Sequence, residues 1–262
     1  MISTRLLSAV TLLLALPLPL FSQAPSSTPT PVLVELFTSE GCSSCPPADR
    51  LLAALQKQQP VGNAHIIVLE EHVDYWDRQG WRDRFSSAQF TQRQNFYAPR
   101  LNFSDSYTPQ MVVDGQSQFL GSDSSKASSA ISQAAQTPKI GLTLSPPTIE
   151  GRKVSGSVSA AATTSLPRGE LYAVLVTPTA STEVKAGENG GRRMDHVSVA
   201  RTFQRIGKLQ DLARGPIAFN INAPNGEDPA HMKLVVFAQL PDQGPVRGVA
   251  EVDTHTEVAA NP

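Results

Sequence analysis

The sequence Val32-Leu33-Val34-Glu35-Leu36-Phe37 is an almost continuous run of apolar, β-forming residues and predicts a buried strand. It continues through a turn at residues 38–41 into Cys42-Ser43-Ser44-Cys45-Pro46-Pro47. From residue 48 the leucines 51, 52 and 55 recur at helical spacing, and a second apolar run follows at residues 66–69. Strand, helix and strand in this order predict a right-handed βαβ unit with parallel strands.

Cys42 and Cys45 are the only two cysteines among 262 residues. The loop between them is too short for a disulfide to remove much entropy from the unfolded chain, so redox or ligand chemistry is the better explanation. The start of a helix favours a thiolate. We therefore expect Cys42 to be the exposed, attacking thiol and Cys45, one turn inside the helix, to be the resolving thiol.

The rest of the chain divides into two regions with different sequence patterns. Residues 77–100 look mainly helical, residues 106–115 and 118–121 read as a hairpin with an Asp-Gly turn, and residues 124–136 fit a closing helix. From Lys139 onward, short β-type runs are separated by Gly and Pro, which is typical of an all-β sandwich. The fold class expected is an α/β domain with a helical insertion at 32–137, followed by a β-sandwich-like domain at 138–262.

The N-terminus has the layout of a secretory signal peptide. Arg5 precedes an apolar run at residues 6–20, so we expect a signal peptide over 1–24 and a Ser/Thr/Pro linker over 25–31. This predicts a secreted or periplasmic protein, with no membrane contact beyond a possible uncleaved signal anchor. The net charge of −1 provides no electrostatic argument for nucleic-acid binding.

Three motifs together resemble a known family. They are residues 34–49 around the cysteines, His72-Val73-Asp74-Tyr75-Trp76-Asp77, and Tyr107-Thr108-Pro109-Gln110-Met111-Val112-Val113. They resemble a family of secreted bacterial proteins catalogued as domain of unknown function 1223 and placed among thioredoxin-like proteins. The resemblance is strong over residues 32–121 and weaker through residues 187–189 and 196–201. It implies a thioredoxin-like fold for the first domain.

The same resemblance implies roles for Thr108 and Pro109. In thioredoxin folds a cis-proline faces the cysteines, and the residue before it offers its backbone to an extended substrate. The sequence departs from ordinary thioredoxins at Gly41, where an aromatic residue is usual, and at Ser43-Ser44, which replace Gly-Pro. The redox potential is therefore not readable from the sequence.

Four further residues are candidates for the site. Glu35 lies near the position where thioredoxins bury a proton-accepting acid, so it is either a buried acid that accepts the Cys45 proton or a residue that reaches a sheet edge or a salt bridge. His72 follows the second strand, where it could tune the thiolate or bind a metal, or simply pack in its loop. Tyr75 and Trp76 could form an apolar platform for a peptide. Gly187-Glu188-Asn189-Gly190-Gly191 reads as a flexible turn and His196 as half of a solvated pair with Asp195, so neither is assigned a role.

The leading hypothesis is a thiol–disulfide oxidoreductase that needs no cofactor and acts on an extended protein or a small thiol, with an unidentified redox partner. One alternative is a binding module in which the two thiolates and His72 hold Cu(I). Another is a non-catalytic interaction protein with a structural disulfide. No sequence spacing marks a zinc site.

Overall fold

The computed structural model describes residues 28–161 and 165–255. The elements in chain order are β1 (Thr30–Thr38), α1 (Pro46–Gln58), β2 (Ala64–His72), α2 (Ala88–Leu101), β3 (Gln110–Val113), β4 (Ser117–Leu120), α3 (Ser124–Ala134), β5 (Leu142–Leu144), β6 (Thr148–Glu150), β7 (Lys153–Ala160), β8 (Glu170–Glu183), β9 (Arg193–Lys208), η1 (Leu209–Arg214), β10 (Ile217–Asn222), η2 (Pro229–His231), β11 (Lys233–Gln239) and β12 (Val246–Asp253).

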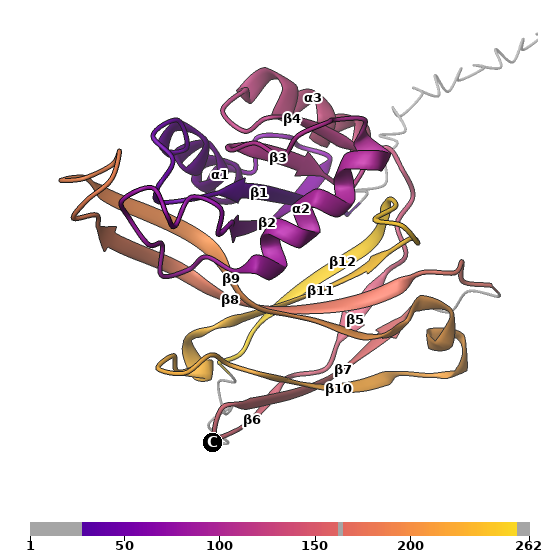
Figure 1. The fold of residues 1–262 in the computed structure, drawn as a ribbon. Helices are drawn as coiled ribbons and strands as arrows, with labels where there is room; N and C mark the ends of the chain where they lie inside the picture. Colours follow the sequence, from indigo (N-terminus) through magenta and orange to yellow (C-terminus); the bar gives the residue numbers. More distant parts are fainter. Residues whose placement is uncertain (1–27, 162–164, 256–262) are drawn as a thin grey trace, which may run out of the picture.

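A single eight-stranded sheet runs through both halves of the chain, in the order β12-β11-β8-β9-β2-β1-β3-β4 (Figure 1). β1 and β2 are parallel, and β3 and β4 are antiparallel to their neighbours. The two halves meet where β9 lies parallel to β2, through the one residue pair Glu70 and Val199. The sheet therefore crosses the boundary that was expected near residue 138.

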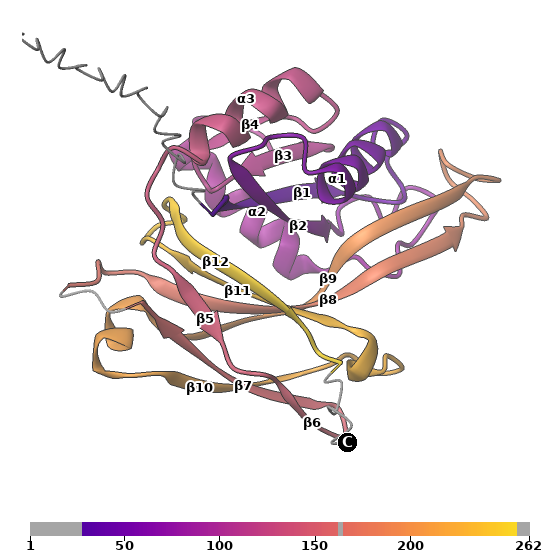
Figure 2. The same ribbon diagram turned by 180° about the vertical axis from the view of Figure 1, so that it is seen from behind.

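Alternate residues of β1 serve opposite faces of this sheet. Val32, Val34 and Leu36 pack in one core with residues of α1 and α3, whereas Leu33 packs in another core with Phe90 of α2. Figures 1 and 2 show α1 and α3 on one side of these strands and α2 on the other. A side chain's position along β1 therefore decides which helix it faces.

The second half of the chain adds a smaller sheet, β10-β7-β5, with β6 paired to β7. Its apolar residues share a core with β8 and β11 of the large sheet, so these strands pack as two layers. β8 and β9 form a long hairpin whose far end projects beyond this layer and lies beside α1 (Figure 2). This projection brings a distant part of the sequence next to the cysteines.

Most of the expected strands and helices are present, with shifted ends. Asp114 and Gly115 both have positive φ angles, of 50° and 62°, which agrees with the expected Asp-Gly hairpin turn. β1 begins at Thr30, within the stretch that was expected to be linker. The residues expected to form the signal peptide lie outside the described part of the chain.

The helical prediction for residues 77–100 is wrong in its first half, since α2 begins only at Ala88. Side chains bind the backbone of the preceding segment and hold it in turns. Asp77 accepts a hydrogen bond from the backbone N–H of Asp83 (3.2 Å), and Asp83 accepts one from Phe85 (2.9 Å). Asp and Ser side chains that compete in this way favour turns over helix.

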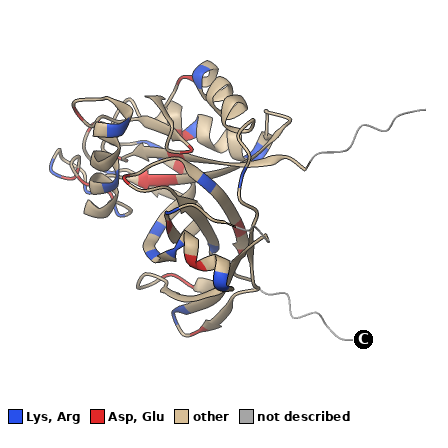
Figure 3. Ribbon diagram, turned by 90° about the vertical axis from the view of Figure 1, so that its right-hand side faces the viewer, with Lys and Arg blue, Asp and Glu red and all other residues tan. Residues whose placement is uncertain are grey.

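Charged residues of both signs are spread over the molecule (Figure 3). Within the described ranges, no helix is long and apolar enough to cross a membrane.

Candidate functional site

Cys42 and Cys45 form a disulfide at the start of α1, with their Cα atoms 5.4 Å apart. The backbone N–H of Cys45 donates to the carbonyl of Cys42 (3.2 Å), and Pro46 and Pro47 open the helix. Cys45 is the N-cap residue of α1, so it does not lie one turn inside the helix, as the sequence suggested. The helix starts later because both prolines fit its first turn.

The expectation of an exposed Cys42 is wrong, because both cysteines are fully buried. The tip of the β8–β9 hairpin, residues 184–192, is bonded to the backbone around Cys42, and we call it the hairpin loop. Asn189 of this loop is itself buried, and its Nδ2 donates to the carbonyls of Glu40 and Cys42 at 2.9 Å each. The exposed Glu188 accepts a hydrogen bond from the backbone N–H of Ser43 (3.2 Å).

Thr108 and Pro109 lie beside the disulfide and are joined by a cis peptide bond. The Ser44 hydroxyl donates to the Thr108 carbonyl (3.5 Å) and lies 3.3 Å from the Cys42 sulfur. Gly121 permits this packing, since a Cβ there would stand 3.1 Å from Cβ of Pro109 and 2.7 Å from Cδ1 of Leu36. A side chain at this position would crowd Leu36 and Pro109, and also Ala48 of α1.

Tyr75 and Trp76 are half-buried and lie next to Thr108. Trp76 Nε1 donates to Oγ1 of Thr108 (2.8 Å), and the Tyr75 hydroxyl donates to Oε1 of Gln94 (3.2 Å). Their ring centroids are 6.5 Å apart. The structure thus brings Trp76, Thr108 and Pro109 together around the cysteines, with Tyr75 as a neighbour.

Glu35 forms a salt bridge, the second of the roles expected for it. Its position on β1 alternates with Val34 and Leu36, so it points to the α2 side of the sheet, away from α1 and Cys45. Arg93 Nε lies 2.6 Å from one carboxylate oxygen, and the Tyr97 hydroxyl donates to the other (2.6 Å). The role of proton acceptor for Cys45 is therefore wrong for Glu35.

We call the group around Arg93 the α2-side cluster, which comprises Glu35, Glu71, Arg93, Tyr97 and Gln239. Arg93 also donates to Oε1 of Gln239 (3.2 Å) and to the Tyr97 hydroxyl (2.9 Å), and all five residues are buried. Burial, together with the Glu35 charge, raises the pKa of Glu71 well above its usual value. Its nearer oxygen lies 3.6 Å from Nε of Arg93.

His72 belongs to a second buried group, on the opposite face of the sheet. We call it the α1-side cluster, and it comprises Glu40, Glu70, His72, Asp83 and His196. His72 Nδ1 lies 2.6 Å from Asp83 Oδ2, and His196 Nδ1 lies 2.7 Å from Glu70 Oε1. The two imidazole centroids are 4.8 Å apart. His196 is therefore not part of a solvated pair with Asp195, because β9 places it against β2.

The charges of the α1-side cluster shift one another's pKa values. Burial alone would lower the pKa of His72, but Asp83 and Glu70 raise it well above normal. Burial is likewise overcome at His196 by Glu70, which raises the pKa to about 9. Burial raises the pKa of Asp49, on α1, to about 7, and the Glu70 charge adds to the shift.

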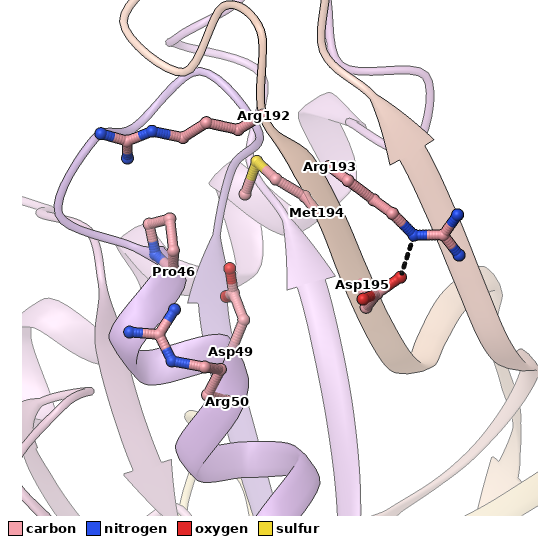
Figure 4. A pocket seen from close by; sticks show the side chains of 7 residues that line it. All are labelled: Pro46, Asp49, Arg50, Arg192, Arg193, Met194 and Asp195. Carbon is pink, nitrogen blue, oxygen red and sulfur yellow. Dashed lines mark hydrogen bonds and ion pairs between the residues drawn. The ribbon is translucent and has the colours of Figure 1, made fainter.

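A pocket of about 510 Å³ opens beside the N-terminus of α1 (Figure 4). It is lined by Pro46, Asp49, Arg50, Arg192, Arg193, Met194 and Asp195. Asp49 points into it in Figure 4, and Arg193 Nε is paired with Asp195 at 3.2 Å. The pocket lies between α1 and the start of β9, next to Pro46, the residue that follows Cys45, and three arginines line it.

Sequence reasoning missed the hairpin loop, His196 and the acids of the α1-side cluster. The loop and His196 are 145 and 126 residues from their partners Ser43 and Glu70, so no local spacing reveals them. One signal was available, because the family resemblance reaches residues 187–189 and 196–201. Those weaker matches include the loop over the disulfide and His196.

The fold and site define a mixed α/β protein with a large mixed sheet and a C-x-x-C disulfide at the start of its first helix. The chain belongs to the family described as protein of unknown function (DUF1223), which matches residues 33–239. No match was found among functionally curated proteins.

Two solved structures are similar to this one. A crystal structure of a protein from Agrobacterium tumefaciens, a structural genomics target, has a TM-score of 0.67 and 22% identity, covering 90% of this chain and 100% of that one. This likeness supports the fold. A domain of the outer membrane lipoprotein Omp28 from Porphyromonas gingivalis has a TM-score of 0.26 and 12% identity, covering 44% of this chain and 88% of that one.

Proposed function

We propose that the protein is a thioredoxin-like thiol–disulfide oxidoreductase that uses Cys42 and Cys45 as its redox pair. The observation that carries the proposal is the disulfide at the start of α1 with the cis peptide of Thr108-Pro109 beside it. The βαβ unit before this peptide and the hairpin after it are the parts that the resemblance to thioredoxins requires.

The chemistry balances without a cofactor. A substrate thiolate attacks the Cys42 sulfur, the bond between Cys42 and Cys45 breaks, and Cys45 leaves as a thiolate that takes up a proton. A second substrate thiol, after losing its proton, attacks the mixed disulfide, which releases an oxidised substrate and reduced Cys42. The reverse sequence reduces a substrate disulfide. The N-terminus of α1 and the Ser44 hydroxyl favour the Cys42 thiolate in both directions.

Both sulfurs are buried, so some part of the surrounding structure must move before exchange. The loop is held near the cysteines by Asn189 and by the exposed contact between Glu188 and Ser43. These few hydrogen bonds make it the part of the cover that opens at least cost. We propose that substrate binding displaces this loop and exposes the Cys42 sulfur.

The substrate proposed is an extended peptide or a small acidic thiol. An extended chain would pair with the backbone at Thr108, across from the Tyr75 and Trp76 rings. The arginines of the pocket in Figure 4 would attract carboxylates at its far end. Export to the periplasm or beyond, where an unidentified partner would recycle the pair, remains part of the proposal and rests on the N-terminal sequence pattern.

Trapping of the mixed disulfide tests the proposal. We expect Cys45→Ser to accumulate a mixed disulfide at Cys42 when the variant is mixed with glutathione disulfide, as seen by mass spectrometry. Dithiothreitol should then release the glutathione. Cys42→Ser, with Cys45 as its only thiol, is the matched control and should form far less adduct. Equal adduct formation by both variants, or none by either, would contradict the assigned order of attack.

The burial of both sulfurs favours one rival, a purely structural disulfide. Such a bridge resists reduction and has a potential below about −300 mV. The copper-binding alternative gains no such support. In the described residues, the group of potential metal ligands that contains His72 also contains Glu70 and His196, and no cysteine belongs to it.

A further inference from the structure

We propose that Glu70, His72 and His196 bind a divalent transition-metal ion between β2 and β9. One potential ligand atom from each of these residues lies within 4.8 Å of the other two, and all three side chains are buried. Two imidazoles and one carboxylate are a ligand set found in zinc sites and in mononuclear iron(II) sites. This inference is independent of the redox function.

The spacing of the atoms fits an ion of this kind. Nε2 of His72 lies 3.6 Å from Oε1 of Glu70. Ligands at about 2.0–2.1 Å from a tetrahedral ion stand roughly 3.3 Å apart, so this pair needs little adjustment. Nδ1 of His196 lies closer to the same oxygen, at 2.7 Å, and that contact would open by about half an ångström around an ion.

A buried nitrogen without a partner points to a ligand. Nε2 of His72, which faces Oε1 of Glu70, is fully buried and makes no hydrogen bond. Buried polar atoms in proteins are nearly always paired, so this unpaired nitrogen calls for an explanation. Oε1 of Glu40 lies 3.6 Å from Nε2 of His196, which places a further carboxylate beside the proposed ligands.

Neighbouring groups already orient the proposed ligands as metal sites require. Asp83 fixes His72 through Nδ1 at 2.6 Å, and this leaves Nε2 free. The backbone N–H of Val197 donates to Oε2 of Glu70 (2.8 Å), so Oε1 is the oxygen that faces the histidines. A carboxylate that holds the second nitrogen of a ligating histidine is a common feature of zinc sites.

Charge and position also suit an ion. A divalent cation held by two neutral imidazoles carries the same charge as two imidazolium groups. It would therefore balance the surrounding carboxylates of Glu40, Glu70 and Asp83 equally well. Asp49, which lines the pocket in Figure 4, marks the side from which an ion could enter. The ion would join β2 to β9, which in the described residues pair through Glu70 and Val199 alone.

Titration with Zn²⁺ alone tests the site. The full chain carrying Cys42→Ser and Cys45→Ser is used, so that thiolates cannot contribute. After treatment with a chelator and its removal, we expect one Zn²⁺ per chain by calorimetry and by elemental analysis, and a higher melting temperature with Zn²⁺.

Substitutions in the same background locate the ion. His72→Asn and His196→Asn should each weaken Zn²⁺ binding at least 100-fold, and Asp83→Asn about 10–100-fold. His231→Asn is the control, because its side chain is 83% exposed and lies outside the cluster. Less than a tenth of an ion per chain, or unchanged binding in both the His72 and His196 variants, would overturn the proposal.

A spectroscopic measurement decides the question if the histidine variants do not fold. Co²⁺ added to the folded Cys42→Ser/Cys45→Ser chain should give the intense visible absorption of a four- or five-coordinate site with nitrogen and oxygen ligands, and Zn²⁺ should abolish it. A weak spectrum like that of Co²⁺ in water would mean that the cluster is an imidazolium–carboxylate network and binds no ion.

Discussion

The α1-side and α2-side clusters lie on opposite faces of the same strands, and they differ in which polar atoms are left unpaired. In the α2-side cluster Arg93 donates to Glu35, Tyr97, Gln239 and Gln243, and the unpaired atoms are the two oxygens of Glu71, one of which lies 3.6 Å from Nε of Arg93. The α1-side cluster leaves both imidazole Nε2 atoms and an oxygen of Glu40 unpaired. A carboxylate beside an arginine serves an ion pair within the fold, whereas an unpaired imidazole nitrogen can bind a metal ion.

The same comparison separates two buried acids that lie near the cysteines in sequence. Glu35 is adjacent in sequence to the apolar residues under α1, yet its side chain lies on the other face of the sheet. Asp49 is on α1 itself and lines the pocket next to Pro46. The face of the sheet on which an acid lies therefore decides whether it neighbours the disulfide.

The largest expected effect is on the α2-side cluster. Arg93→Met should lower the free energy of unfolding by about 3–5 kcal/mol, because it leaves the Glu35 carboxylate buried without its cation. Urea unfolding measures this loss. Arg214→Met is the matched control, since Arg214 is exposed and pairs only with a partly exposed Asp211, and it should leave the midpoint unchanged.

The α2-side cluster should not affect disulfide exchange. Under conditions where the variant is folded, Glu35→Gln should reduce and reoxidise at the wild-type rate over the whole accessible pH range. A rate that falls several-fold in Glu35→Gln, with the fold intact by circular dichroism, would restore the proton-acceptor role and contradict the assignment of Glu35 to a structural pair.

A smaller effect is expected on the face that carries the disulfide. Asn189→Ala removes two hydrogen bonds to the carbonyls of Glu40 and Cys42, worth about 1 kcal/mol each. Opening of the hairpin loop should become easier, so reduction by dithiothreitol should accelerate on the order of 10-fold. Asn220→Ala, at an exposed position of β10, is the control. Equal rates in both variants would show that the loop does not limit access to the sulfurs.

The smallest change in unfolding free energy is expected for the hydrogen bond between Trp76 and Thr108, beside the disulfide. Trp76→Phe and Thr108→Val each remove the hydrogen bond between these two side chains. A double-mutant cycle on the unfolding free energy should give a coupling of about 1 kcal/mol. Additive effects would mean that Trp76 does not position Thr108, and would weaken the case for a shaped substrate platform.

Local patterns predicted the strands, the first helix and the Asp114-Gly115 turn, because apolar runs, helical spacing and turn residues act over short distances. The face served by Glu35 was not readable, since β1 is apolar on both sides and its alternation does not say which side α1 covers. The burial of Cys42 was not readable either. One neighbour of Cys42, Asn189, is 147 residues away and reaches it through a hairpin whose position depends on the whole sheet.

The proposed metal ligands show the same limit. Glu70 and His72 are two residues apart on β2 and therefore lie on the same face. His196 joins them only because β9 lies parallel to β2, and no short sequence spacing encodes a pairing between distant strands. Sequence alone can rank such residues only after the strand order is known.

The reduction potential of the Cys42–Cys45 disulfide tests the central claim most directly. It is measured by equilibrating the full chain with glutathione or dithiothreitol buffers and quantifying free thiols. We predict a potential between about −270 and −120 mV, the range of proteins that exchange disulfides. A potential below about −300 mV would contradict it, and would identify the pair as a structural bridge beneath the hairpin loop.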